Sequence, residues 1–181
     1  MTVPPQRPAQ HPEKTAMLLL AQNVREPVAL LGVRGYYRAS MGDSGCNDRG
    51  IYDDAIFVAS PSCHVAFNAN TDPSVQRPGV AVLDPGVWRY KLGIHGLSKP
   101  VERQYQALVQ ADEVRVTRDG GRREGGYFGI NIHRGGEHET SSLGCQTIYK
   151  PQWAEFINLV RGQLERYQQV VLPYLLTEYQ G

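Results

Sequence analysis

Between Val28 and Ile132 the chain consists of short apolar runs that each end at a turn signal. The run 65–70 is followed by Thr-Asp-Pro, and the run 80–83 is followed by Asp-Pro-Gly, after which 87–92 begins another. Runs of this length between turn residues are typical of strands rather than of amphipathic helices. With 19 glycines and 12 prolines among its 181 residues, the chain is also rich in turn formers. The pattern predicts a mainly β, loop-rich fold.

A hairpin signal lies in the middle of this region. The segment 113–117 alternates polar and apolar residues, and it runs directly into Arg-Asp-Gly-Gly at 118–121, a combination that favours a tight turn between antiparallel strands. We expect the returning strand to span 127–133. Alternation would then place Phe128, Ile130 and Ile132 on one face, and Tyr127, Gly129, Asn131 and His133 on the other.

The periodicity changes near the C-terminus. Apolar residues from Trp153 to Tyr167 recur at three- and four-residue spacing, which predicts a covering helix over 151–170 that ends before Pro173. A second, short helix is expected over 14–24. The fold class is therefore mainly β with one or two helices. Residues 1–14, which include four prolines, are expected to form a flexible leader, and residues 15–181 a single domain.

Charge and composition exclude several classes of function. The net charge of +1 provides no overall field for nucleic acid. The apolar run 16–21 is six residues long, whereas a bilayer span needs about 20, and no secretory cleavage pattern follows it. We therefore expect synthesis in the cytoplasm without a signal peptide and no membrane insertion. Three cysteines without C-x-x-C spacing indicate neither a disulfide framework nor a zinc ribbon.

The segment 129–148 has the residues for thiol chemistry. His133 ends a predicted strand, a loop of 11 residues with three glycines follows, and Gly144 precedes Cys145. A nucleophilic thiol needs a nearby base and backbone N–H groups that hold an oxyanion. Such a pair predicts a cysteine nucleophile, whose pKa an imidazolium at His133 would lower. The alternative is that Cys145 is a small buried residue.

These residues also carry a family resemblance. Ile132-His133 and Ser142-Leu143-Gly144-Cys145 resemble the active-site motif of the L,D-transpeptidase (YkuD-like) catalytic domain. The resemblance implies a β-sandwich of that type, Cys145 as the nucleophile and His133 as its general base. It further implies an oxyanion turn at Gly144 and the Cys145 amide, with Ser142 and Leu143 in the supporting loop.

The resemblance implies action on peptidoglycan stem peptides, at the bond after the L-centre of diaminopimelate, through an acyl-enzyme that an amine or water resolves. L,D-transpeptidase, L,D-carboxypeptidase and endopeptidase outcomes stay open. The family often has His where this chain has Leu143, and commonly Arg where it has Thr147. Without a signal peptide, the chain resembles phage-encoded lysis enzymes or delivered effectors, which reach the cell wall after lysis or delivery.

Four residues are candidates for substrate binding: His95, Asn131, Arg134 and Tyr127. His95 in Gly-Ile-His-Gly also competes with His133 as the base. Asn68, Asn70 and Asp72 either face the same cleft or cap turns. We expect no cofactor.

Other interpretations remain open at this stage. His133 and His138 could serve a metallopeptidase, although the His-Glu loop is more typical of a solvated tip, and we expect no metal. A thiol hydrolase of another class, or a non-catalytic wall-binding or structural module with Cys145 buried, is also compatible with the sequence. The acidic stretch 43–54 lacks EF-hand spacing and is more typical of an Asx-rich loop. Adjacent Cys63 and His64 would point to opposite faces of a strand.

Overall fold

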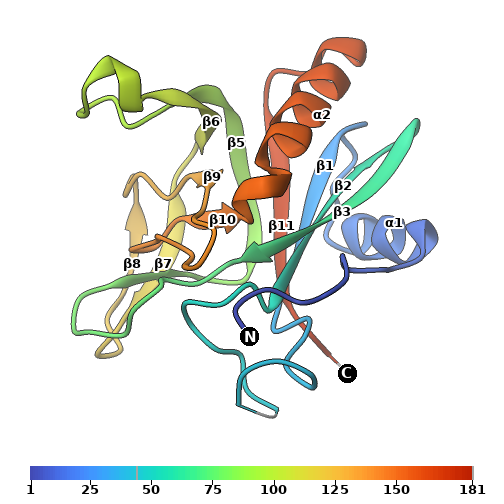
Figure 1. Ribbon diagram of the computed structural model, residues 1–181. Coiled ribbons are helices and arrows are strands. Elements are labelled where there is room, and N and C mark those ends of the chain that lie inside the picture. Colours follow the sequence, from blue (N-terminus) through green and yellow to red (C-terminus); the bar gives the residue numbers. More distant parts are fainter. Residues whose placement is uncertain (44, 181) are drawn as a thin grey trace.

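The computed structural model describes residues 1–43 and 45–180 (Figure 1). Ser44, in the predicted Asx-rich loop, and Gly181, the last residue of the predicted domain, lie outside the described residues. Two α-helices are present in the described part, α1 (Pro12–Ala21) and α2 (Trp153–Arg166), together with the 3₁₀ turns Val101–Arg103 and Lys150–Gln152. The strands are β1 (Ala29–Arg34), β2 (Asp54–Ser60), β3 (Cys63–Asn70), β4 (Ala81–Leu83), β5 (Gly86–His95), β6 (Tyr105–Gln110), β7 (Val114–Arg118), β8 (Arg123–Gly126), β9 (Ile132–Arg134), β10 (Gln146–Ile148) and β11 (Leu172–Glu178).

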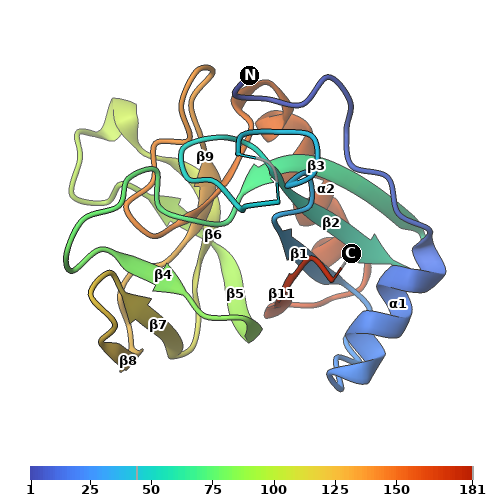
Figure 2. The ribbon, with the colours of Figure 1, turned by 90° about the horizontal axis from the view of Figure 1, so that it is seen from below.

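The described strands form a closed barrel and a small separate sheet. The barrel order is β1-β11-β5-β6-β9-β10-β3-β2, and β4-β7-β8 form the three-stranded sheet. Two neighbouring pairs in the barrel, β1–β11 and β9–β10, are parallel, and the other pairs are antiparallel. Figures 1 and 2 show α2 and α1 on different sides of the barrel and the small sheet set apart from both. The prediction of a mainly β fold with one or two helices is confirmed.

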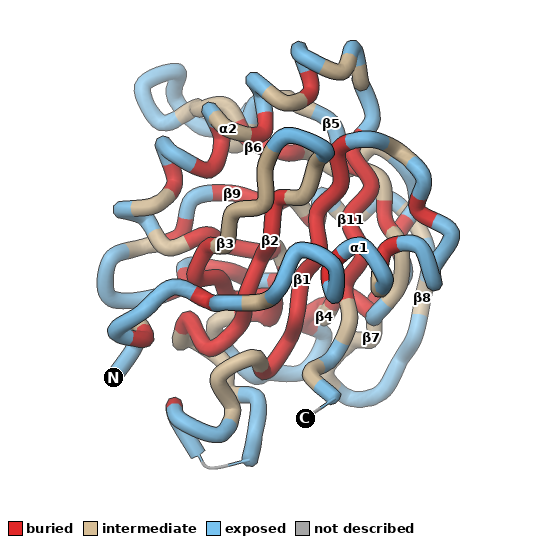
Figure 3. Tube along the Cα trace, turned by 90° about the vertical axis from the view of Figure 1, so that its right-hand side faces the viewer, coloured by how far each residue is buried: buried red, intermediate tan, exposed pale blue. Residues whose placement is uncertain are grey.

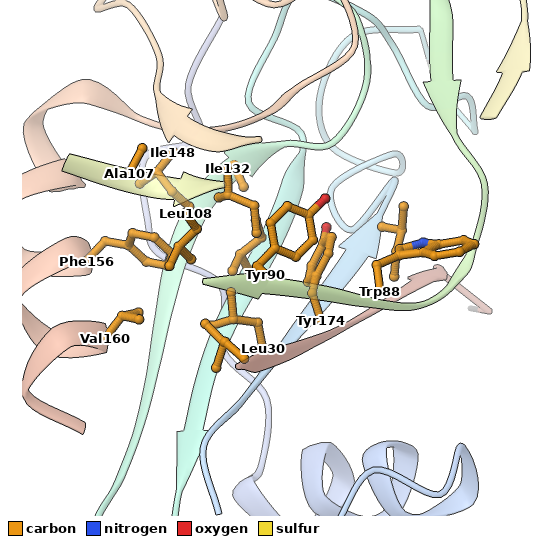
Figure 4. Close-up of a cluster of buried hydrophobic side chains, with 14 of the residues drawn as sticks. Leu30, Trp88, Tyr90, Ala107, Leu108, Ile132, Ile148, Phe156, Val160 and Tyr174 are labelled. Atoms are coloured by element: carbon orange, nitrogen blue, oxygen red, sulfur yellow. The ribbon is translucent and has the colours of Figure 1, made fainter. Parts of the chain in front are cut away.

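The barrel interior holds the main core. Tyr90 and Tyr174 are fully buried and meet edge to face with their ring centroids 5.7 Å apart, and Leu108 and Ile132 lie in the same cluster (Figure 4). The strands β1, β2 and β11 are buried along most of their length (Figure 3). Burial on both faces explains why these three strands are continuous apolar runs without the alternation that identifies a half-buried strand.

The helix α2 packs on the barrel through the predicted stripe. Trp153, Phe156, Ile157, Val160 and Leu164 are all buried. The helix is shorter than the predicted 151–170, because residues 150–152 form a 3₁₀ turn and Gln168 has a φ of +51°. The helix α1 likewise ends before the predicted residue 24, since Asn23 has a φ of +60°. A non-glycine residue in the left-handed region cannot continue a right-handed helix.

The predicted hairpin exists, but its returning strand was predicted wrongly. Gly121 N–H donates to Arg118 O at 2.8 Å in the turn, and β8 pairs with β7 over 123–126. The chain from 127 to 131 is irregular, and β9 begins only at Ile132. Gln110 explains the break: its side-chain Oε1 accepts the N–H groups of Phe128 and Ile130, both at 3.2 Å. One side chain thus satisfies the amides that a neighbouring strand would otherwise bind.

The N-terminal residues contact the rest of the chain. Arg7 forms a two-point ion pair with Glu155 of α2 at 2.9 and 2.6 Å, and Tyr36 Oη donates to Ala9 O at 2.6 Å. The flexibility of residues 1–14 and the division of the chain into leader and domain stay predictions. Among the described residues, no helix combines the length and the apolar character that crossing a bilayer requires.

Candidate functional site

The parallel pair β9–β10 brings the two predicted catalytic residues to one place. Ile132 pairs with Gln146, His133 pairs with Thr147, and Gln146 N–H donates to Asn131 O at 2.8 Å. Cys145, directly before β10, therefore lies beside Asn131. Paired strands lie about 4.8 Å apart and each residue advances about 3.3 Å, so the Cα atoms of Cys145 and His133 are roughly 8 Å apart.

His133 is held in one tautomer. Its Nδ1 lies 2.8 Å from Arg134 O, and because a carbonyl only accepts, Nδ1 carries the proton. Within residues 1–43 and 45–180, no hydrogen bond occupies Nε2, which is the atom that can accept a proton. The ring is only 6% exposed. Burial, followed by the neighbouring His95, lowers the pKa of His133 to about 4, so the imidazole is neutral near pH 7.

Cys145 is half-buried and bonded to the backbone. Its Sγ accepts from Asn131 N–H and donates to Gly129 O, each at 3.4 Å. Burial raises the pKa of the thiol, and the Asn131 N–H opposes that shift only in part. The prediction of a lowered pKa was therefore wrong for the resting protein, because no imidazolium stands beside the thiol. None of the described hydrogen bonds joins Cys145 to His133, and the resting pair is a neutral thiol and a neutral imidazole.

The turn before the thiol is fixed by Ser142. Its Oγ donates to Cys145 O at 2.6 Å and accepts from Gly144 N–H at 3.0 Å. Gly144 has a φ of +142°, and a Cβ at this position would lie 2.9 Å from Ala81 O. Only glycine fits here without strain. The Gly144 amide is thus already used, whereas in the described part of the chain no hydrogen bond takes up the Cys145 amide.

The rest of the loop between His133 and Cys145 is held by contacts with Tyr52 and Lys150. Tyr52 Oη lies 2.8 Å from Gly136 O and 3.1 Å from Glu139 O, and Glu137 pairs with Lys150 at 2.7 Å. His138 is exposed at the tip, whereas His133 is buried. The two histidines of the metallopeptidase interpretation therefore differ in environment. Over the described ranges, no group of three or more His, Cys, Asp or Glu residues is arranged to hold a metal ion.

The lining of a groove of about 830 Å³ includes Gly129 and Asn131, the two residues that hydrogen-bond Cys145 Sγ, but not Cys145 itself. Residues 91–99, the end of β6, Tyr127, Gly129 and Asn131 line it. Three of the four predicted substrate-binding residues, His95, Asn131 and Tyr127, thus share one groove, whose wall includes the carbonyl that binds Cys145. Arg134, the fourth, places its guanidinium 4.6 Å from the ring centroid of Tyr105 instead.

Leu143 lies apart from this groove. It is 63% exposed and lines a smaller hollow of about 400 Å³ together with Ala81 and Arg118. Thr147, which stands where the family commonly has Arg, is fully buried, and its hydroxyl is without a hydrogen bond in the described part of the chain. The polar residues Asn68, Asn70 and Asp72 are buried and bond to nearby backbone or to Arg34.

Two residues of the site escaped sequence reasoning. Tyr105 places its hydroxyl 3.4 Å from Nδ1 of His133. Gln110 binds the segment that leads to Asn131, through Gly126 O at 2.9 Å and the amides of Phe128 and Ile130. Both lie on β6, whose Tyr-Gln-Ala-Leu-Val-Gln sequence alternates only loosely. The signal that was available is the run of β-favouring residues before the Asp112 turn.

No protein family model, curated protein or solved structure matches this chain.

Proposed function

We propose that this chain catalyses cysteine-dependent acyl transfer or hydrolysis on peptidoglycan stem peptides, with an active site of the L,D-transpeptidase type and the β architecture of that family. One observation supports this most directly: Arg134 O fixes the His133 tautomer whose Nε2 accepts a proton, at the strand pair that also carries Cys145. A buried imidazole that is oriented by its Nδ1–H and has an open Nε2 is suited to general base catalysis.

The proposed first step is acylation. As Sγ attacks the carbonyl carbon after the L-centre of diaminopimelate, its proton passes to Nε2 of His133. Such coupling avoids a free thiolate, which burial disfavours. The Cys145 amide donates to the oxyanion, and the imidazolium then protonates the departing amine. The products of the step are a thioester on Cys145 and a free amine.

The second step releases the acyl group. His133 removes a proton from water or from an acceptor amine, which attacks the thioester and regenerates the thiol. Thr147 in place of the family's arginine, with its hydroxyl buried, provides no cation to hold an acceptor. Arg134 packs on Tyr105 and leaves the groove to Lys91 and Lys99. Because no cation stands at position 147, two residues after the nucleophile, we propose that water competes well, which favours carboxypeptidase or endopeptidase products from a protein that reaches the wall after lysis or delivery.

Muropeptide mass spectrometry tests the proposal. Purified tetrapeptide muropeptides are incubated with the protein, with and without an excess of a D-amino acid. Shortened stems in both samples support hydrolysis, whereas exchange of the terminal residue without shortening supports transfer and contradicts the preference for water. Cys145→Ala should give no product, and the matched Cys63→Ala variant should behave as wild type. Product that requires a divalent metal and survives Cys145→Ala would mean that the metallopeptidase interpretation is right.

A further inference from the structure

We propose that His95 is a positioning residue that fixes the ring plane of His133 and covers one face of that ring on the side of the groove. The proposal rests on the function proposed above. The two imidazole rings stack with their centroids 4.2 Å apart and their planes at 26°. His95 lines the groove and His133 does not. A substrate in the groove would therefore meet His95 first, with the proton-accepting ring directly behind it.

His95 is itself held in place by groups of the same site. Asn131 Nδ2 lies 3.5 Å from Nδ1 of His95, and Asn131 Oδ1 accepts from Gln110 N–H at 3.1 Å. The backbone N–H of Asn131 donates to Cys145 Sγ. One asparagine therefore contacts both the stacked ring and the thiol. The ring of Tyr105 also packs against His95, with centroids 5.3 Å apart.

The charged and titratable groups around the pair come from every element packed on it. They are Lys99 after β5, Tyr105 on β6 and Arg134 on β9, and Cys145 before β10 is linked to His95 through Asn131. Lys99 and Arg134 are cations, so they oppose protonation of His133, and Lys99 also opposes protonation of His95. A proton on either ring would further repel a proton on the other across 4.2 Å. The stack therefore favours the neutral, proton-accepting form of His133.

This arrangement has a consequence for the pH range of the reaction. A solvated imidazole becomes protonated near pH 6.5 and then no longer serves as a base. Buried and stacked on one face against His95, His133 stays neutral in more acidic solution. Removal of the stacked ring admits water to His133 and removes the neighbouring imidazole whose positive charge would repel a proton on His133. Protonation of His133 therefore becomes easier.

The test compares His95→Ala, which removes the ring, with His95→Phe, which keeps a stacked ring without a proton site. The titration midpoint of His133 is measured by NMR, and the pH dependence of kcat/KM is measured on muropeptides. We expect His95→Ala to raise the midpoint by about one unit or more and to move the acid limb with it. We also expect kcat to fall about tenfold because the base loses its orientation. His95→Phe should keep the midpoint closer to wild type and recover most of kcat.

His138→Ala, at the exposed loop tip, serves as the control and should change neither quantity. An unchanged midpoint in His95→Ala, or equal behaviour of the alanine and phenylalanine variants, would overturn the proposal. If the alanine variant does not fold, His95→Gln, which keeps bulk without a ring, replaces it. The NMR midpoint does not depend on turnover. A protein inactive on muropeptides would therefore disprove the proposed function while the midpoint still decides the role of His95.

Discussion

Two Cys/His pairs among the described residues can be compared, Cys63 with His64 and Cys145 with His133. Their histidines are alike in two respects. His64 stacks on Phe57 with centroids 5.5 Å apart, much as His133 stacks on His95. The pKa of each histidine is lowered, chiefly by burial. A stacked ring and a lowered pKa therefore do not distinguish the two pairs, although His133 is buried and His64 only half-buried.

The partners of the ring nitrogens do distinguish them. Nε2 of His64 lies 2.9 Å from Thr15 Oγ1, so this ring joins β3 to α1. His133 is bonded through Nδ1 to its own strand, and its Nε2 carries no hydrogen bond within the described residues. Cys63 and His64 are also consecutive on one strand, whereas His133 lies on β9 and Cys145 lies directly before its parallel partner β10. The two histidines therefore differ in whether Nε2 is free to accept a proton, and on this difference we propose His133, and not His64, as the base.

The largest expected effect is a difference in turnover between variants of the two thiols. Cys145→Ala should lower the turnover of muropeptides by at least about a thousandfold, because the nucleophile is lost. Cys63→Ala should leave turnover unchanged. Product is quantified by mass spectrometry, and circular dichroism checks that both variants fold. Equal loss in the two variants would remove the distinction between the pairs.

The two histidines should also respond differently. His133→Ala should slow turnover by about a hundredfold or more, since a general base contributes about 10²–10⁴. His64→Ala should retain activity and instead lower the free energy of unfolding by about 1–3 kcal/mol, through the hydrogen bond to Thr15 and the contact with Phe57. Urea unfolding and turnover are measured on the same preparations. An inactive but fully stable His64 variant would contradict this assignment.

A third variant tests the turn that presents the thiol. Gly144→Ala should reduce turnover by about tenfold or more, because the new Cβ meets Ala81 O and the φ of +142° is unfavourable for alanine. The matched change is Gly162→Ala on α2, where a Cβ meets nothing within 4 Å; there we expect full activity and a gain of about 1 kcal/mol in stability. Full activity of the Gly144 variant would show that the turn does not position the thiol.

The smallest expected effect concerns the pH dependence of kcat/KM. The base must be unprotonated, so kcat/KM should fall as the pH drops through about 4, the pKa of His133. On the alkaline side the thiol stays protonated to above its ordinary range, since burial raises its pKa. His64→Ala should leave the acid limb in place. An acid limb near pH 6.5 in the wild type would mean that the base is a solvated imidazole and not the buried ring.

Much of this architecture follows from the sequence, and the exceptions have physical causes. The strand ending at Asn70, the turn at Gly120 and the buried stripe of α2 were each predicted, because local periodicity or turn residues indicate them even where they pack on distant parts of the chain. The strands β1, β2 and β11 were not identified, since full burial erases their alternation. The prediction of the returning strand over 127–133 was wrong because Gln110, 18 residues before Phe128, binds the amides of Phe128 and Ile130.

The candidate site, like the fold, was predicted only in part from the sequence. One strand pairing brings together the His133 and Gly144-Cys145 segments that the sequence proposes as the site, and their catalytic role stays a prediction. The protonation states of Cys145 and His133 were not predicted. The thiol and the imidazole are neutral because of burial and, for His133, because of His95, whose stacking on His133 has no local signal in the sequence.

The central claim is that Cys145 forms the acyl-enzyme with His133 as its base. It is tested most directly by intact-protein and peptide mass spectrometry after rapid acid quenching of a reaction with tetrapeptide muropeptides. We expect an adduct with the mass of the acyl fragment on the peptide that contains Cys145, absent from Cys145→Ala and strongly reduced in His133→Ala. Product formation that persists in Cys145→Ala, or an adduct on Cys63 or Cys46 instead, would contradict it.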